Sequence, residues 1–298
     1  MIDNLGRTEQ EFLQAYDANQ FDRPSVTVDM LIFTILNEAE SNYRKLPEKE
    51  LRVLLVKRGQ HPFFGKWALP GGFVGIKESL EDAAIRELKS ETNIDNLYLE
   101  QLYTWGDPGR DPRTRVISTS YMALVDSSNL VLQAGEDAAD AKWFAVNDRL
   151  LEEKKTTGES GLRIERLVEI TLKNGSEDLQ YTVKITTEVK DRTAKVSRKI
   201  VSNSGMAFDH GLIIYYGLER LRNKIEYTDI AFNLMPELFS LTELQQVYEV
   251  ILNQELLKAN FRRKIAHMVV ETDHIKRDAG HRPSQLFRFN PLWEKDNF

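Results

Sequence analysis

The sequence predicts an α+β protein with two folded units joined by a strand-rich segment. In the first half, β-branched and apolar runs at residues 26–36 and 116–125 are typical of buried strands, and one amphipathic helical period follows Ser79. The last third carries helical periods and then a short hairpin signal. With 298 residues, of which 41% are hydrophobic, the chain can fill more than one core. The expected units are residues 1–155, 156–205 and 206–298.

The composition excludes several classes of protein. A formal net charge of −6 and a pI near 5.6 argue against a protein that coats nucleic acid over its whole surface, but they allow a local basic patch. The absence of cysteine excludes disulfides, a thiol nucleophile and a thiolate metal site. Because no apolar run approaches the ~20 residues that span a bilayer, we expect a cytoplasmic protein without a membrane partner.

The first unit is expected to contain a short N-terminal helix, a loop and a series of strands. Residues 8–16 predict a short helix, and an aromatic and basic loop occupies residues 58–69. The expected strands are residues 26–36, 51–57, 97–103 and 116–125, with residues 142–144 as an edge strand.

The most informative stretch runs from residue 71 to residue 94. Gly71 and Gly72 follow Pro70, so the backbone can turn sharply and approach a ligand closely. Ser79 and Asp82 predict a capped helix start, and the helix then places Glu87 and Glu91 four residues apart on one face. Two such carboxylates repel each other, which makes a divalent cation between them an obvious candidate.

This stretch resembles the signature of the Nudix family. The positions that match the signature are Gly72, Glu78, Arg86, Glu87, Leu88, Glu91 and Ile94. Ser90 stands where the signature has a glutamate, and Asn93 stands where it has a glycine. The resemblance implies a Nudix α/β/α sandwich with a mixed sheet. Asn93 can adopt the left-handed conformation that follows a helix, but the Ser90 hydroxyl is a poor magnesium ligand.

The resemblance also directs attention to a ligand site. Gly71 and Gly72, with Arg58 and Trp67 from the loop before them, are candidates to hold a phosphate or stack on a base. The alternative, with equal support, is that the aromatic residues of that loop cover the sheet and hold no ligand.

A second loop, residues 106–115, looks like that of Nudix proteins acting on ADP-ribose. Its arginines, Arg110 foremost, then Arg113 and Arg115, would pair with a diphosphate; a solvated charge cluster is the alternative. Glu136 or Asp137 is a candidate for an additional acidic group, or part of an exposed turn.

The middle segment reads as an inserted β-hairpin. Alternating runs at residues 164–172 and 179–189 flank Asn174-Gly175, which is a strong hairpin-turn signal, and a basic polar run fills residues 190–199. The sequence does not indicate a function for this segment.

The last unit predicts a winged helix-turn-helix. Helical periods at residues 211–223 and 241–252, the second capped by Ser240, precede a basic helix at residues 258–268 and a hairpin with its tip near Arg282. Eight basic and three acidic residues between Lys258 and Arg288 give this segment a local charge of +5. The residues expected to contact DNA are Lys258, Arg262, Arg263, Lys264 and Arg282. A dimerisation domain is the alternative.

Together the two units resemble the Nudix-related transcriptional regulators. The resemblance implies a Nudix domain that senses ADP-ribose or a sugar-derived metabolite and a winged helix that binds double-stranded operator DNA as a homodimer. With Ser90 in place of a glutamate, we expect the pocket to bind its ligand without cleaving it efficiently.

Two other readings stay open. A magnesium-dependent hydrolase of the ADP-ribose pyrophosphatase type would hold Mg²⁺ through Glu87, Glu91 and Glu136, with Glu87 orienting water. A protein in which both domains merely bind partners is the third possibility.

Overall fold

The computed structural model describes residues 2–37, 47–92, 98–126, 138–158, 161–175, 177–276 and 283–293. Across these ranges, no helix is long and apolar enough to span a membrane. The helices are α1 (Glu9–Ala15), α2 (Leu80–Thr92), α3 (His210–Ile225), α4 (Leu241–Leu252) and α5 (Lys258–Ile265), with short 3-10 turns η1 (Ala18–Gln20), η3 (Ile230–Leu234) and η4 (Ala266–Met268). The strands are β1 (Ser25–Asn37), β2 (Lys49–Arg58), β3 (Trp67–Ala68), β4 (Gly71–Phe73), β5 (Tyr98–Trp105), β6 (Val116–Val125), β7 (Ala138–Gly158), β8 (Gly161–Asn174), β9 (Glu177–Lys190), β10 (Thr193–Ser204), β11 (Val269–Lys276) and β12 (Ser284–Phe289).

One large mixed sheet organises the molecule. Its order is β10-β9-β8-β7-β2-β1-β6-β5, with β3 added to β2 and β4 added to β1. The central strand β1 runs parallel to β6 and antiparallel to β2 and β4. Because β1 is buried on both faces, it reads as a continuous apolar run rather than as an alternating one.

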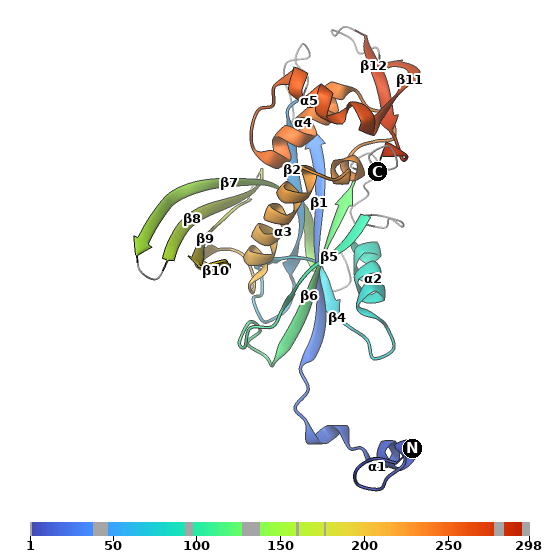
Figure 1. Ribbon diagram of the computed structural model, residues 1–298, viewed down its shortest axis with the longest axis vertical. Coiled ribbons are helices and arrows are strands. Elements are labelled where there is room, and N and C mark those ends of the chain that lie inside the picture. Colours follow the sequence, from blue (N-terminus) through green and yellow to red (C-terminus); the bar gives the residue numbers. More distant parts are fainter. Residues whose placement is uncertain are drawn as a thin grey trace.

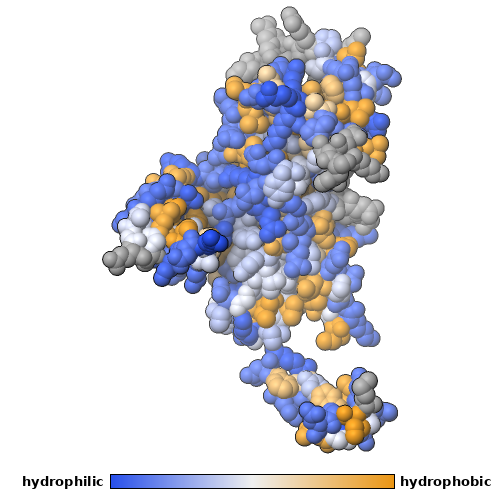
Figure 2. Space-filling model, in the orientation of Figure 1, coloured by the Kyte–Doolittle hydropathy of each residue, from blue (hydrophilic) through white to orange (hydrophobic). Residues whose placement is uncertain are grey.

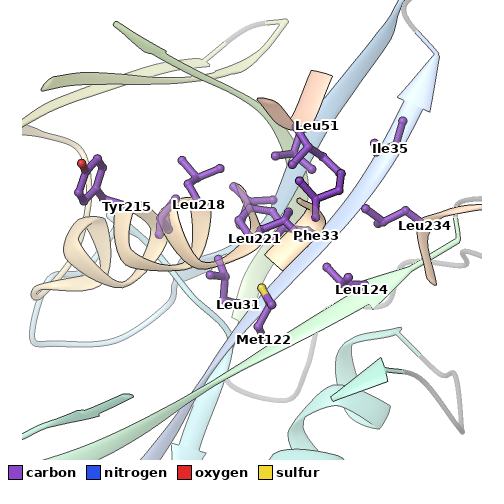
Figure 3. Close-up of a cluster of buried hydrophobic side chains, with 14 of the residues drawn as sticks. Leu31, Phe33, Ile35, Leu51, Met122, Leu124, Tyr215, Leu218, Leu221 and Leu234 are labelled. Atoms are coloured by element: carbon purple, nitrogen blue, oxygen red, sulfur yellow. The ribbon is translucent and has the colours of Figure 1, made fainter. Parts of the chain in front are cut away.

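Alternate residues of β1 build two separate cores. Val28, Met30 and Ile32 face α2 and pack with its small residues. Leu31 and Phe33 face the opposite way and pack against α3 (Figure 3). The sheet is therefore covered by one helix on each face, which confirms the predicted α/β/α sandwich (Figure 1).

The helix α3 packs on this sheet, although its place in the chain predicts that it belongs to the C-terminal unit. Its buried face, which includes Leu218 and Leu221, lies on the central sheet (Figure 3). An amphipathic period shows that a helix has an apolar face but not which partner covers it, so the sequence placed this helix with its chain neighbours. The C-terminal unit follows α3 and begins near η3.

The helix α3 approaches β1 so closely that a side chain at Gly217 has no room. A Cβ built there would lie 2.0 Å from Cδ2 of Leu31, and Leu31 is fully buried. We expect Gly217→Ala to lower the free energy of unfolding by ~1–3 kcal/mol, although alanine normally favours a helix over glycine by about 1 kcal/mol. Urea denaturation measures the change.

The matched control for that substitution is Gly106→Ala. A Cβ at Gly106 would meet only the tip of Arg115, at 3.9 Å, so its stability should change by no more than about 0.5 kcal/mol. An unchanged or higher stability of Gly217→Ala would show that α3 can move away from β1 without cost.

The middle segment is more than an inserted hairpin. Strands β7, β8, β9 and β10 form a continuous antiparallel extension of the central sheet that projects from the body (Figure 1). The predicted hairpin turn is confirmed: Asn174 ends β8 and pairs with Glu177 at the start of β9, and Gly175 follows Asn174 with a positive φ of 45°. Residues 142–144, the predicted edge strand, pair with β2, and the strand β7 that contains them continues and pairs with β8 from Ala145 onward. Most of the basic run at residues 190–199 lies in β10.

The C-terminal unit has the predicted winged-helix elements. Ser240 and Glu243 form a capping box at the start of α4, and Asn253 ends that helix in the left-handed conformation. The basic helix is α5, which ends at Ile265 and continues as the 3-10 turn η4, and β11 pairs with β12 to form the wing. Phe261 and Ile265 anchor α5 on α4.

A single hydrophobic core joins this unit to the sandwich. Buried residues of α4 and α5 belong to the same cluster as Leu31 and Phe33 of β1. Arg222 on α3 adds polar links, since its guanidinium pairs with both oxygens of Asp148 at 2.5 and 2.8 Å and donates to the carbonyl oxygen of Ile251 at 2.7 Å. The two units are thus packed together rather than tethered.

The N-terminal arm stands apart from this body. The helix α1 begins with a capping box between Thr8 and Glu11 but buries no residue. Large apolar side chains, such as Leu13 and Phe21, are exposed along the arm (Figures 1 and 2).

Candidate functional site

A cavity of about 670 Å³ opens between the Nudix-like motif and the first residues of α3. Three segments far apart in the sequence form its walls: the end of β2 with the loop after it, the motif with α2, and the loop at residues 106–115. Phe208 and His210 complete the lining from the other side. The cavity has the size and mixed polarity of a small-molecule site.

The two glycines of the motif lie in close contact with their neighbours, against backbone at Gly71 and against the end of a side chain at Gly72. Gly71 pairs with Asp29 of β1, and a Cβ on Gly71 would lie 2.3 Å from the backbone oxygen of Val28. A Cβ on Gly72 would lie 2.2 Å from Oε1 of Glu87. Both glycines line the cavity, so the bare backbone of β4 forms part of its wall.

Charged groups fix the loop that leads into α2. Arg86 donates to both carboxylate oxygens of Glu78, at 2.8 and 3.1 Å, and to the carbonyl oxygen of Phe73. The hydrogen bonds from Arg86, followed by one from the Gly75 amide, lower the pKa of Glu78 to about 2. Arg86 also pairs with Glu87. These contacts explain why a glutamate and an arginine eight residues apart belong to the motif.

The metal-binding potential of α2 is incomplete. Glu87 and Glu91 both line the cavity, and the hydroxyl of Ser90 between them donates to the backbone oxygen of Glu87 at 3.1 Å. Among the described residues, no group of three acidic or histidine side chains is arranged to hold a metal ion. Mg²⁺ prefers several hard oxygen ligands, so these residues fit it only in part. Glu136, the predicted third acid, lies outside the described residues, as do Asp137 and Asn93.

Arg110 is a deeply buried cation of the cavity, with a side chain only 6% exposed. Its guanidinium pairs with both oxygens of Asp209, at 2.7 and 2.9 Å, and reaches Asp29 at 3.3 Å. Burial by itself would lower the pKa of Arg110, but the contacts with Asp209 and Asp29 outweigh it and raise that pKa. One cation thus pairs with two carboxylates from different parts of the chain.

His210 sits beside this pair, buried at the start of α3. Its Nδ1 accepts a hydrogen bond from the Leu69 amide at 2.9 Å, so Nε2 carries the proton and faces Asp29 at 3.5 Å. Burial lowers the pKa of His210 below its ordinary value, and the nearby Arg110 and Arg58 lower it further, while Asp29 and Asp209 oppose them. The imidazole is therefore neutral at neutral pH.

The predicted ligand residues separate into two groups. Arg58, Gly71, Gly72 and Arg110 all line the cavity, and the guanidinium of Arg58 lies over the ring of Phe208. Trp67 does not line it. Its ring is buried against Phe144, and its indole N–H donates to Glu177. This placement fits the alternative in which the aromatic loop covers the sheet.

The other two arginines of the loop at residues 106–115 differ from Arg110. Arg113 is half exposed and forms a two-point pair with Asp111 at the edge of the cavity. Arg115 is outside the cavity lining. Only Arg110 is enclosed.

A second charged surface lies on the winged helix. The exposed basic residues of α5 are Lys258, Arg262, Arg263 and Lys264. Phe261 and Ile265, one helical turn apart, form the buried face that holds the helix in place. Arg263 contacts Asn260 at 3.3 Å, and Lys264 pairs with Glu226 at 3.1 Å. Arg282, the predicted contact from the wing, lies outside the described residues.

Comparison with known proteins identifies each of the two units by its own family model. Residues 44–163 match the NUDIX domain, and residues 231–289 match the NrtR DNA-binding winged helix domain. The ADPR responsive transcriptional repressor NtrR of Acinetobacter baylyi is 32% identical over 286 residues, which cover 95% of this chain and 88% of the relative. The chain belongs to the NrtR family.

Solved structures agree with that membership. NrtR of Shewanella oneidensis, complexed with a 27mer DNA, is 27% identical with a TM-score of 0.59, and the match covers 91% of this chain and 95% of that one. A MutT/nudix family protein from Enterococcus faecalis is 26% identical with a TM-score of 0.64, covering 95% and 94% of the two chains. Both matches span the sandwich and the winged helix together.

In this NrtR family member, the cavity residues that the sequence did not indicate include Asp29, Phe208 and His210. Asp29 is a single acid inside an apolar strand, which was a detectable signal because a buried carboxylate requires a partner. Phe208 and His210 precede or begin a helix of the other predicted unit, and no local pattern links them to the cavity.

Proposed function

We propose that this protein is a metabolite-responsive transcriptional regulator. Its winged helix would bind double-stranded operator DNA, with Arg262 and Arg263 of α5 at the major groove and Lys258 and Lys264 at neighbouring phosphates. The observation that carries the proposal is the exposed cationic face of α5. The sandwich on which α5 is held has a cavity lined by the Nudix motif, with Ser90 in place of a glutamate.

The ligand that suits the cavity best is ADP-ribose or a closely related metabolite. Gly71 and Gly72 allow a ligand to approach the backbone, and Arg58, Arg86 and Arg110 supply positive charge for a diphosphate. Phe208 and Phe73 offer apolar faces within the same walls. The A. baylyi relative responds to ADP-ribose according to its name, which supports the same choice.

Operator binding would require two copies of the chain. A winged helix reads a short half-site, and a homodimer that presents two α5 helices would read a palindrome in the cytoplasm, where the DNA lies. We propose this oligomeric state from the docking geometry of helix-turn-helix proteins.

The test is binding of the purified protein to its own upstream DNA at controlled salt, with and without ADP-ribose. We expect sequence-selective binding that weakens with salt and that ADP-ribose changes several-fold. Equal affinity for operator and scrambled DNA would refute the regulator function, and an unchanged affinity in saturating ADP-ribose would refute the choice of effector.

Hydrolysis is the second candidate, because Glu87 and Glu91 still line the cavity. With the serine at position 90, we expect magnesium-dependent cleavage of ADP-ribose to be slow. If the protein instead cleaves ADP-ribose at rates ordinary for enzymes, and Glu91→Gln abolishes this turnover, the protein is an enzyme.

A further inference from the structure

The segment that precedes α3 contributes to the wall of the cavity and is held in place by β3. The Trp67 amide donates to the Gly205 carbonyl oxygen at 3.0 Å, and the Ala207 amide donates to the Trp67 carbonyl oxygen at 2.8 Å. Phe208 then adopts a positive φ of 49°, which is strained for a bulky residue. Such strain persists only where the surrounding contacts impose it. These contacts therefore hold the start of α3 beside the cavity.

Asp209 occupies the N-cap position of α3 without capping it. Its carboxylate makes no hydrogen bond to the first turn of the helix, although aspartate is a favoured N-cap residue. It is instead paired at two points with Arg110, on the opposite wall of the cavity. The position of the α3 N-terminus is therefore tied to a guanidinium that an anionic ligand in the cavity would also attract.

The other end of α3 reaches the DNA-binding unit. The helix has 16 residues, which corresponds to about 24 Å along its axis. Near its end, Arg222 donates to the Ile251 carbonyl oxygen in the last turn of α4, and Leu221 belongs to the core shared with α4 and α5. A packed helix moves as a rigid body, so a displacement at Asp209 would be carried to α4.

We propose that the pair between Asp209 and Arg110 couples the cavity to the winged helix. The diphosphate of an ADP-ribose-like effector competes with Asp209 for Arg110, and Asp209, once released, allows the N-terminus of α3 to shift. Asp29 stays with Arg110 and with Ser118, whose hydroxyl donates to it at 2.6 Å, so Arg110 remains anchored while it changes partner. This inference rests on the proposed function.

The variant that tests the coupling is Asp209→Asn. Asparagine keeps the size of the side chain and is a good N-cap, but it removes the charge that competes for Arg110. If the pair holds the unliganded state, the variant resembles the liganded protein. We expect ADP-ribose to bind about three- to tenfold more tightly, and the ratio of operator affinities without and with ADP-ribose to fall to within about twofold of 1.

The matched control is Glu219→Gln, on the same helix. Glu219 pairs with Arg198 at 2.8 Å and is not part of the cavity lining, so the acid-to-amide change leaves the cavity intact. Its ADP-ribose affinity and its affinity ratio should equal those of the wild type. Circular dichroism checks that each variant is folded, and Asp209→Ser, another good N-cap without charge, replaces Asp209→Asn if that variant unfolds.

The outcomes separate the coupling from the function. A wild-type protein whose operator affinity ignores ADP-ribose would overturn the proposed function and the coupling with it. A wild-type protein that responds, together with an Asp209→Asn variant that binds ADP-ribose and keeps the wild-type ratio, would overturn the coupling alone. A ratio near 1 for Glu219→Gln as well would also overturn it, since any change on α3 would then suffice.

Discussion

Replacing Arg262 and Arg263 together with alanine should lower operator affinity by about 10²- to 10³-fold, because each arginine at a groove or phosphate contributes ~1–3 kcal/mol. Both side chains are exposed, and α5 is held by Phe261 and Ile265, so the fold should not change. The salt dependence of binding should also become shallower, since fewer counterions are released. Fluorescence anisotropy with labelled operator at several salt concentrations measures both effects.

A matched control for that variant is the double substitution Lys195→Ala and Lys199→Ala. These lysines are exposed on β10, in the sheet extension, and their removal changes the net charge by the same amount. Their variant should keep its operator affinity to within about threefold, the scale of a weak long-range charge effect. Equal losses in the two double variants would mean that overall charge, not α5, governs binding.

The second large effect is expected for Arg110→Ala. Removal of this guanidinium leaves Asp29 and Asp209 close together without their cation. Loss of one partner from a buried ion pair costs about 3–5 kcal/mol of unfolding free energy, because the remaining charge stays buried. Chemical denaturation at pH 8 measures this loss. Isothermal titration calorimetry of the folded protein should also show weaker ADP-ribose binding, since the diphosphate loses a partner.

The control for that loss is Arg7→Ala in the N-terminal arm. Arg7 pairs with Asp3, and because the two side chains are 39% and 38% exposed, neither charge is left buried and the removal should leave the free energy of unfolding almost unchanged. Similar losses for the two arginines would show that the enclosure of Arg110 has no energetic consequence.

His210 gives the Arg110 variant a pH dependence of known sign. In the wild type, the folded state holds His210 neutral with a lowered pKa, so stability is present above its ordinary value near 6.5 and is lost as the pH falls below it. Without Arg110, the two carboxylates raise the pKa of His210. A protonated His210 then offsets their charge, so the destabilisation by Arg110→Ala should be smaller at pH 5.5 than at pH 8.

Local features of the fold were predictable from the sequence. The helix α2 and the capping box of α4 depend on residues three or four apart, and the hairpin turn at Asn174-Gly175 depends on two neighbours. Such contacts are encoded within one turn of chain, so spacing alone reveals them. The two-unit architecture and the basic helix α5 followed from the same kind of signal.

The cavity was predictable only in part, because its walls come together from distant segments. The contacts of Arg110 with Asp29 and Asp209 span 81 and 99 residues of sequence. Trp67 looked like a ligand residue but bonds to Glu177, 110 residues away in the sheet extension. The partner of α3 was hidden for the same reason, since an apolar helix face shows the need for a cover and not its identity.

The order in which the chain is made gives the position of α3 another consequence. The face of β1 that bears Leu31 and Phe33 is synthesised early, but the helix that covers it begins only at His210. The 85 or so residues between the end of β6 and α3 take roughly 4–17 s to translate at ~5–20 residues per second. During that interval α3 is not yet available to cover this apolar face, so the core between α3 and the sheet can be completed only late in synthesis.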